Sequence, residues 1–375
     1  MDHPSPAGTA PSASIGDTAG QIVLVLQRGG ALGSYQAGVY QALHEAGVEP
    51  DWIIGTSIGA INASLIAGNK PEDRLPRLEQ FWKTMEQGPP WAFASSWPSM
   101  DDRLAHWSVL THGVPGFFKP NPLAYLGDTY PLGPESAAYY STAPLRATLE
   151  NLVDFDLINR RKPRLTVGTA HVRTSQMRYF DSRDGALGVD HILASGALPP
   201  AFPPVRIDGE LYWDGGILSN TPTEVVFDDN PRRDSLIFSV HLWNALGTDP
   251  TTMAEVFNRQ KDVQYSSRIG SQIGRQAQIH QLRHIIMQLE SQLPEALRED
   301  PEVKELASYG CRTRMHIVRL LAPQLDRETH TKDADFSAAS LRQRWNAGYA
   351  DARAAVERGA WREEHDPLAG LILHE

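Results

Sequence analysis

The chain has 375 residues, of which 41% are hydrophobic, 8% aromatic and 21% charged. This composition is typical of a globular protein of one or two domains, and it excludes a collagen or a fully disordered chain. The single cysteine, Cys311, excludes an intramolecular disulfide and fits a reducing compartment. The net charge of −10, without any long run of basic residues, argues against nucleic acid as a partner.

The amino-terminal segment and the distribution of apolar residues bear on where the protein is found. Residues 1–20 are rich in proline, serine, alanine and glycine, which predicts a disordered tail. They lack the basic start and the apolar run of a secretory signal peptide. No stretch reaches the roughly 18 uninterrupted apolar residues of a membrane-spanning helix. These features predict a cytoplasmic protein whose contact with a membrane would be peripheral.

The first ordered elements alternate between strand-like and helix-like patterns. Residues 22–27, IVLVLQ, form a short β-branched run that is typical of a strand buried on both faces. Residues 34–47 have apolar positions at helical spacing. A second strand is predicted within 51–57 and a second helix within 58–69. This order predicts βαβ units and a mostly parallel α/β sheet.

Residues 88–140 differ in character from the segments around them. They contain ten aromatic residues among many prolines and glycines, which predicts a long, loop-rich insertion. Because tryptophan and tyrosine suit the boundary between water and lipid, the insertion is a candidate lid or acyl-chain channel, whereas for most of these aromatics taken singly we favour packing in the core. Strand-like segments then resume at 164–172, 177–182, 211–214 and 235–243.

The composition changes again near residue 250. From 269 to 293 apolar residues recur every three or four positions, which predicts a long helix, and further helices are predicted around 302–309 and 337–358. We therefore divide the chain into a tail of residues 1–20, an α/β domain of residues 21–245 that carries the insertion, and a helical carboxy-terminal extension of residues 246–375.

The pattern G-x-S-x-G at residues 55–59 suggests a nucleophile. Ser57 lies directly after a predicted strand and directly before a predicted helix. Flanking glycines suit the strained turn that exposes such a serine, because larger side chains would collide there. The amino terminus of the following helix favours the negative charge that develops as the hydroxyl attacks.

The glycine-rich turn at residues 28–33 also lies between a strand and a helix. A dinucleotide-binding turn would require an acidic residue at the end of the next strand, but that strand ends in the serine turn. An oxyanion hole requires backbone amides near the nucleophile, and glycines let a substrate approach them closely. We favour the oxyanion hole over the dinucleotide-binding turn, and a tight turn that binds no ligand is a further alternative.

A serine nucleophile needs a base, and Asp214 is the candidate. It lies at a predicted strand end and is followed by Gly215 and Gly216, so nothing bulky obstructs its carboxylate. An isolated D-G-G sequence is usually only a turn. Upstream, residues 194–205 form a run of small residues and prolines that is suited to line a cleft.

In combination these segments resemble the patatin-like phospholipases, over about residues 21–245. The resemblance implies a three-layer α/β/α fold with a mostly parallel sheet, and acyl hydrolysis by a serine–aspartate dyad without histidine. The helices beyond residue 250 are similar to a carboxy-terminal extension of some bacterial members. The motifs that carry the resemblance are residues 29–38, residues 55–59, Ala194-Ser195 with Pro199 and Phe202, and residues 214–216 with Asn220 and Pro222.

The resemblance also implies roles for individual residues. Ser57 would be the nucleophile and Asp214 the base, with the amides of Gly29 and Gly30 as the oxyanion hole. The substrate would be a lipid or fatty-acyl ester, and neither a cofactor nor a metal ion is implied. The glycines that would support the motifs are Gly33, Gly55, Gly59, Gly215 and Gly216.

Two positions depart from the family's usual glycine motif. Arg28 stands where a first glycine is usual, which predicts strain in the turn. Leu32 stands where a basic residue is usual, which removes a cation that would favour a phosphate group. Phospholipids and neutral esters are therefore both considered as substrates.

Two other functions are considered. A catalytically inactive lipid-binding protein would keep the fold and lose the chemistry. A Ser–Asp–His triad of the α/β-hydrolase type is disfavoured, because Ser57 follows only the second predicted strand whereas the nucleophile of that fold follows several. The histidines available to such a triad are His241, His280, His284 and His316.

Residues 268–284 combine arginines and histidines with Ile269, Ile273 and Leu282 and contain no acidic residue. This pattern fits either a basic amphipathic helix at a lipid surface or, as we favour, a helix packed on the α/β core. His280 and His284 lie one helical turn apart but lack an evident third ligand, so no metal site is expected here.

Overall fold

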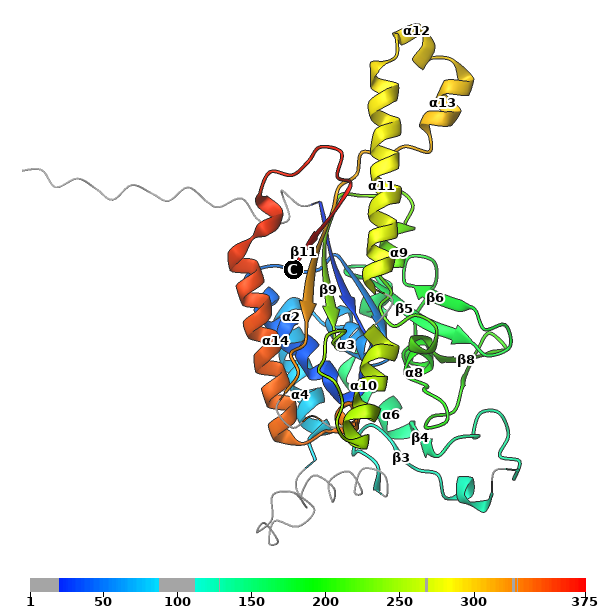
Figure 1. Cartoon of the computed structure of the whole chain (residues 1–375). Helices are drawn as coiled ribbons and strands as arrows, with labels where there is room; N and C mark the ends of the chain where they lie inside the picture. Colours follow the sequence, from blue (N-terminus) through cyan, green and yellow to red (C-terminus); the bar gives the residue numbers. More distant parts are fainter. Residues whose placement is uncertain (1–19, 88–111, 128, 267–268, 326–327, 329) are drawn as a thin grey trace, which may run out of the picture.

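The computed structural model describes residues 20–87, 112–127, 129–266, 269–325, 328 and 330–375. A large sheet forms the centre of the molecule, with helices on both faces (Figure 1). Its strands in chain order are β1 (Gln21–Leu26), β2 (Trp52–Thr56), β5 (Arg164–His171), β6 (Met177–Asp181), β7 (Val205–Ile207), β8 (Glu210–Asp214), β9 (Ser235–His241), β10 (Met315–Leu321) and β11 (Leu371–His374).

The sheet is mostly parallel, as predicted. Its strand order is β11-β10-β9-β1-β2-β5-β8-β7, with β6 also paired to β5. The six strands from β11 to β5 run parallel to one another, whereas β6, β7 and β8 are joined by antiparallel pairs. β1 pairs with β2 and β9 along its two edges, and its side chains are buried on both faces of the sheet, as its continuous apolar sequence indicates.

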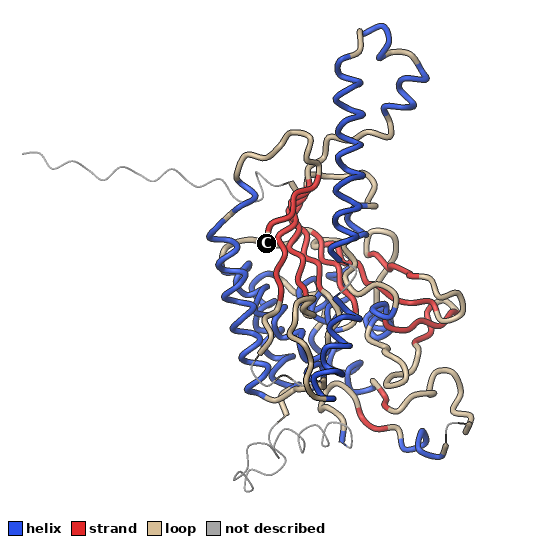
Figure 2. Tube along the Cα trace, in the orientation of Figure 1, coloured by secondary structure: helices blue, strands red, loops and turns tan. Residues whose placement is uncertain are grey.

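Helices cover the two faces of the sheet in separate layers (Figure 2). Side chains from α2, α3, α4, α8 and α14 join the larger hydrophobic core on one face, and side chains from α9 and α11 join a smaller core on the other. Alternate residues of β1 supply the two cores: Leu24 the first and Val25 the second. The chain therefore has a three-layer α/β/α fold.

The helices before residue 250 are short, apart from α2 and α4. The α4 helix was not anticipated from the sequence. The helices in this part of the chain are α2 (Ser34–Glu45), α3 (Ile58–Ala67), α4 (Pro71–Met85), α6 (Ala143–Leu152), α7 (Phe155–Asn159), α8 (Val189–Ser195) and α9 (Glu224–Phe227).

The region beyond residue 250 contains the expected helices, but it also contains two strands that the sequence did not predict. β10 pairs with β9 and β11 with β10, so this region extends the central sheet. Its helices are α10 (Met253–Ser266), α11 (Ile269–Gln292), α12 (Glu295–Arg298), α13 (Pro301–Ala307) and α14 (Ala338–Arg358).

The α14 helix lies against α2 along much of its length (Figure 1). The two backbones meet at glycines: a Cβ on Gly38 would overlap the carbonyl of Trp345, and one on Gly348 would overlap the carbonyl of Tyr35. The Tyr35 hydroxyl donates to Asp351 at 2.7 Å. The carboxy-terminal region is thus built onto the same core as the first βαβ units.

The long helix α11 combines a packed half with a projecting half (Figure 1). Ile273 is buried in the smaller core, and His280 and His284 are buried too. Leu282, expected to share the apolar face with Ile273, is 60% exposed. The first half of the helix therefore packs on the α/β core, which was the favoured interpretation.

Residues 88–111 of the aromatic insertion lie outside the described residues. In the described part, a two-stranded sheet joins β3 (Lys119–Pro120) to β4 (Tyr140–Ser141). Phe117 and Phe118 are buried and contact Phe202, whereas Tyr125 and Tyr130 are exposed. No helix in the described ranges combines the length and the apolar character needed to cross a bilayer.

Candidate active site

Ser57 occupies a strained turn between β2 and α3. Its backbone has φ 58° and ψ −125°, a conformation that residues with a side chain rarely adopt. A Cβ on Gly55 would overlap the carbonyl of Gly59, and a Cβ on Gly59 would overlap the carbonyl of Leu26 on β1. Both glycines of the G-x-S-x-G pattern are therefore required. At Gly55 the start of α3 leaves no space for a side chain, and at Gly59 the neighbouring strand β1 leaves none.

Gly59→Ala tests this close approach. The added methyl group would force α3 away from β1, so we expect a loss of about 1–3 kcal/mol in the free energy of unfolding and reduced hydrolysis. Urea unfolding and ester turnover measure the two effects. The matched control is Gly185→Ala, because a Cβ at Gly185 meets nothing within 4 Å. Equal stability of the two variants would contradict the prediction.

Ser195, at the end of α8, holds the serine turn in place. Its Oγ accepts a hydrogen bond from the amide of Ser57 at 2.9 Å and donates one to the carbonyl of Gly168 at 2.7 Å. Ser195 is fully buried. The turn is thus attached to both α8 and β5, and the amide of Ser57 is already occupied. The sequence placed Ser195 in a family motif but assigned it no role.

Asp214 ends β8 and is fully buried beside the serine turn. Its Oδ1 accepts a hydrogen bond from the amide of Gly216 at 2.7 Å. Its Oδ2 is buried and has no hydrogen-bond partner among the described residues. Burial raises the pKa of the Asp214 carboxyl, while the positive charge of Arg28, the nearby Ser57 side chain and the Gly216 amide each lower it. The fold therefore brings Ser57 and Asp214 together.

The two glycines after Asp214 are explained by close approaches. A Cβ on Gly215 would come within 2.6 Å of the Gly168 carbonyl on β5. A Cβ on Gly216 would overlap the side chain of Arg28. Gly215 therefore allows the turn to pack against β5, and Gly216 allows it to pack against the side chain of Arg28.

Arg28 follows β1 and is 5% exposed. Its guanidinium carbon lies 4.3 Å from the centre of the Tyr265 ring of α10, a cation–π distance. Its φ is not positive, so the strain expected from an arginine at this position is absent. The side chain instead places a positive charge near Asp214.

The glycine-rich turn lies next to the serine turn. Gly30 has φ 56°, and a Cβ there would overlap the carbonyl of Asp333. A Cβ on Gly33 would lie 2.5 Å from Cγ1 of Ile58, the residue that follows Ser57. The amides of Gly29 and Gly30 donate to no other group within the described part of the chain. Both amides are therefore available to an oxygen atom of a substrate.

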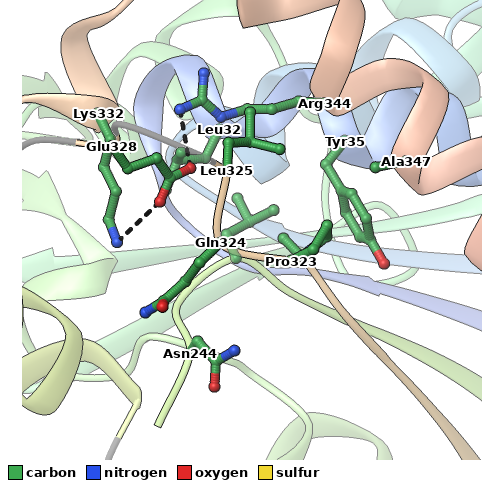
Figure 3. A pocket seen from close by; sticks show the side chains of 12 residues that line it. Leu32, Tyr35, Asn244, Pro323, Gln324, Leu325, Glu328, Lys332, Arg344 and Ala347 are labelled. Atoms are coloured by element: carbon green, nitrogen blue, oxygen red, sulfur yellow. Dashed lines mark hydrogen bonds and ion pairs between the residues drawn. The ribbon is translucent and has the colours of Figure 1, made fainter. Parts of the chain in front are cut away.

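A pocket lined by Leu32 lies behind the glycine-rich turn, and its charged residues bind one another (Figure 3). Lys332 Nζ lies 2.7 Å from Asp262 Oδ1 and 3.5 Å from Glu328 Oε2, and Arg344 Nη2 lies 3.2 Å from Glu328 Oε1. These ion pairs join α10, α14 and the short 3-10 helix η4 (Lys332–Ala334). Because Gly30 contacts this helix, we interpret the network as a support for the glycine-rich turn.

The four histidines considered for a triad are engaged elsewhere. His241 Nε2 lies 2.9 Å from Ser239 Oγ, and His284 Nε2 lies 2.8 Å from the carbonyl of Thr313. His280 packs against Phe227, and His316 lies against His374. None of them is among the groups that shift the pKa of Asp214. The geometry therefore favours a dyad over a triad.

Comparison with known proteins identifies similarity in two parts of the chain. Residues 24–227 match a family model described as "Patatin-like phospholipase", and residues 263–368 match one described as "Patatin phospholipase". The human patatin-like phospholipase domain-containing protein 6 is 30% identical over 212 residues, which are 56% of this chain and 12% of that protein. Lysophospholipase nte1 of Aspergillus terreus is 28% identical over 263 residues, 63% of this chain and 14% of that protein.

The chain thus aligns with only a small part of these relatives' length. Among solved structures, VipD from Legionella pneumophila is similar, with a TM-score of 0.39 and 14% sequence identity. That alignment covers 95% of this chain and 72% of VipD.

Proposed function

Because the chain belongs to the patatin-like phospholipase family, we propose that it hydrolyses carboxylic esters of lipids, with Ser57 as nucleophile and Asp214 as base. The observation that carries this proposal is the position of Ser57 in a strained turn beside the buried, partly unpaired carboxylate of Asp214. The proposed catalytic groups all lie within residues 21–245, to which we assign the hydrolase domain.

The proposed reaction has two halves. In the first, the Ser57 proton moves to Oδ2 of Asp214 while Oγ attacks the ester carbonyl carbon. The carbonyl oxygen becomes negatively charged and is bound by the amides of Gly29 and Gly30. Asp214 then gives its proton to the leaving alcohol, and an acyl-serine remains. In the second half, Asp214 takes a proton from water, the resulting hydroxide attacks the acyl-serine, and the proton returns to Ser57 as the fatty acid leaves.

The electrostatics of Asp214 suit a base that works without histidine. A carboxylate at an ordinary pKa is too weak to deprotonate a serine efficiently, and burial raises the pKa of Asp214. The positive charge of Arg28 limits this rise and favours the ionised form. Arg28 therefore has a role in this chain that the glycine usual in the family could not perform.

Arg28→Met is expected to shift the pH dependence of hydrolysis. Asp214 acts as a base only when ionised, so the rate falls as the pH falls through its pKa. Without the positive charge of Arg28 this pKa rises further, and the acidic limb of the profile moves to higher pH. Profiles of kcat/KM against pH measure the shift. Arg28→Lys, which keeps the charge, is the control, and an unshifted limb in the Met variant would contradict the prediction.

A substrate panel tests the proposed activity. The lysophospholipase name of one relative favours a phospholipid or lysophospholipid, whereas Leu32 in place of a basic residue leaves neutral esters as candidates. Hydrolysis of phosphatidylcholine, lysophosphatidylcholine, a triacylglycerol and p-nitrophenyl esters ranks the classes. A fluorophosphonate probe shows independently whether a serine is reactive. No turnover and no labelling would favour an inactive lipid-binding protein.

We further propose a cytoplasmic protein that contacts membranes locally. The net charge of −10 disfavours adsorption of the whole molecule to anionic bilayers. Leu123, Tyr125 and Leu126, in the described part of the insertion, are more than half exposed and suit a lipid surface. Flotation with neutral and anionic liposomes, compared with a Leu123→Ser/Leu126→Ser variant, tests this contact.

A further inference from the structure

Three histidines that are distant in sequence meet at one edge of the central sheet. His316 lies on β10, His374 lies on β11, and His365 lies on the segment between α14 and β11. One ring nitrogen from each lies within 4.8 Å of the other two. His316 Nδ1 is 3.0 Å from His374 Nε2, and the ring centres are 5.1 to 5.4 Å apart. In the described part of the chain this is the one group of three side chains with the spacing of metal ligands.

The strand register explains how two of these rings come together. His316 pairs with Ile372 and Val318 pairs with His374 in the parallel ladder. Because residues two apart on a strand share a face, His316 and His374 point to the same side of the sheet. Val318 places that side in the larger core. Trp361, just before His365, packs on Phe238 of the same side with a ring separation of 5.8 Å.

The ring nitrogens of the three histidines are only partly paired by hydrogen bonds. One hydrogen bond joins His316 to His374, while Nε2 of His365 is buried and has no partner within the described residues. An unsatisfied buried polar atom destabilises the fold.

The dimensions and the chemistry of the cluster fit a transition-metal ion. Zinc binds histidine nitrogen at about 2.0–2.1 Å, which in a tetrahedral site separates the nitrogens by roughly 3.3 Å, so small ring rotations suffice. Three imidazoles without a thiolate suit zinc, copper or nickel rather than calcium or magnesium. The neighbouring Arg319 and Arg358 both bind Glu375, so their positive charges are partly compensated.

We propose that His316, His365 and His374 form a binding site for a divalent transition metal, with zinc as the expected ion, that fastens β11 and the segment before it to β10. β11 is an edge strand of four residues, so a link to β10 and to the segment after α14 would stabilise it. His316 pairs with Leu236, which pairs with Ile22 at the start of β1, whereas Ser57 follows the end of β2. The site is therefore structural and separate from the proposed hydrolytic centre.

Zinc titration of the full chain tests the site. The protein is prepared without a polyhistidine tag, stripped with a chelator and titrated with zinc by calorimetry, with Co²⁺ as a spectroscopic probe of coordination. We expect one equivalent to bind, a visible cobalt spectrum of a four-coordinate site, and a Tm that rises with zinc concentration. His365→Gln and His374→Gln are each expected to weaken binding at least tenfold and to remove the rise in Tm.

His330→Gln is the matched control, because His330 is exposed and lies outside the cluster. It should bind zinc as the wild type does, and circular dichroism establishes that all variants are folded. The absence of stoichiometric binding by the wild type would overturn the proposal. So would equal affinities of the wild type and a His365→Gln/His374→Gln double variant. None of these measurements depends on ester hydrolysis.

Discussion

Ser57→Ala is expected to lower kcat for ester hydrolysis by at least about a thousandfold and to abolish labelling by a fluorophosphonate probe. The variant removes the only oxygen proposed to form the acyl intermediate, while Asp214 and the glycine amides remain. Binding of the substrate should change little, because the alanine occupies less space than the serine. Single-turnover assays with p-nitrophenyl esters measure the chemical step directly.

Ser64→Ala is a matched control for this variant. Ser64 is a buried serine of α3, the helix that follows Ser57, and its hydroxyl donates only to the carbonyl of Ile61 within that helix. Its replacement should leave turnover and labelling close to those of the wild type. Ser57→Ala with wild-type turnover would show that another group is the nucleophile, and it would remove the basis for the dyad.

The local features of the proposed site were predictable because each depends on a few consecutive residues. The alternation of short apolar runs with helical spacing predicted β1, α2, β2 and α3 to within a few residues. The pair of glycines around Ser57 predicted a strained turn, and its positive φ confirms it. The glycines that permit this turn lie within two residues of Ser57, so the local sequence shows them directly.

Contacts between distant segments were not predictable in the same way. The roles of Ser195 and Arg28 depend on where α8 and α10 lie relative to the two turns, and no local pattern encodes that position. β10 and β11 were not predicted, because the helical spacing of apolar residues is the stronger pattern in the region beyond residue 250. β11 has only four residues, and His316 and Arg319 interrupt the apolar residues of β10, so each strand gives a weak signal in sequence.

The histidine cluster shows the same limit for metal sites. His316 and His374 are 58 residues apart, and they meet only because β11 joins the sheet beside β10. By contrast, His280 and His284 have regular helical spacing, but both are buried and His284 binds a backbone carbonyl. Spacing along the chain therefore drew attention only to this pair, where no metal site was expected, and gave no sign of the cluster of His316, His365 and His374.

Asp214→Asn is expected to lower kcat by about 10²–10⁴-fold and also to lower the free energy of unfolding. The amide keeps the size of the carboxylate, and its oxygen can still accept the hydrogen bond from Gly216. It cannot accept the Ser57 proton, so the nucleophile loses its base. The substitution also leaves the charge of Arg28 without its neighbouring carboxylate, which adds an electrostatic cost that Arg28→Met should relieve.

The double variant Arg28→Met/Asp214→Asn separates these two effects. If Asp214 is the base, removing Arg28 restores stability but no activity, and the residual rate loses the acidic limb that Asp214 gives to the wild type. Asp228→Asn, at an exposed aspartate, controls for the loss of one negative charge. Recovery of hydrolysis in the double variant would contradict the role of Asp214, because it would mean that the unpaired Arg28 charge alone had suppressed the reaction.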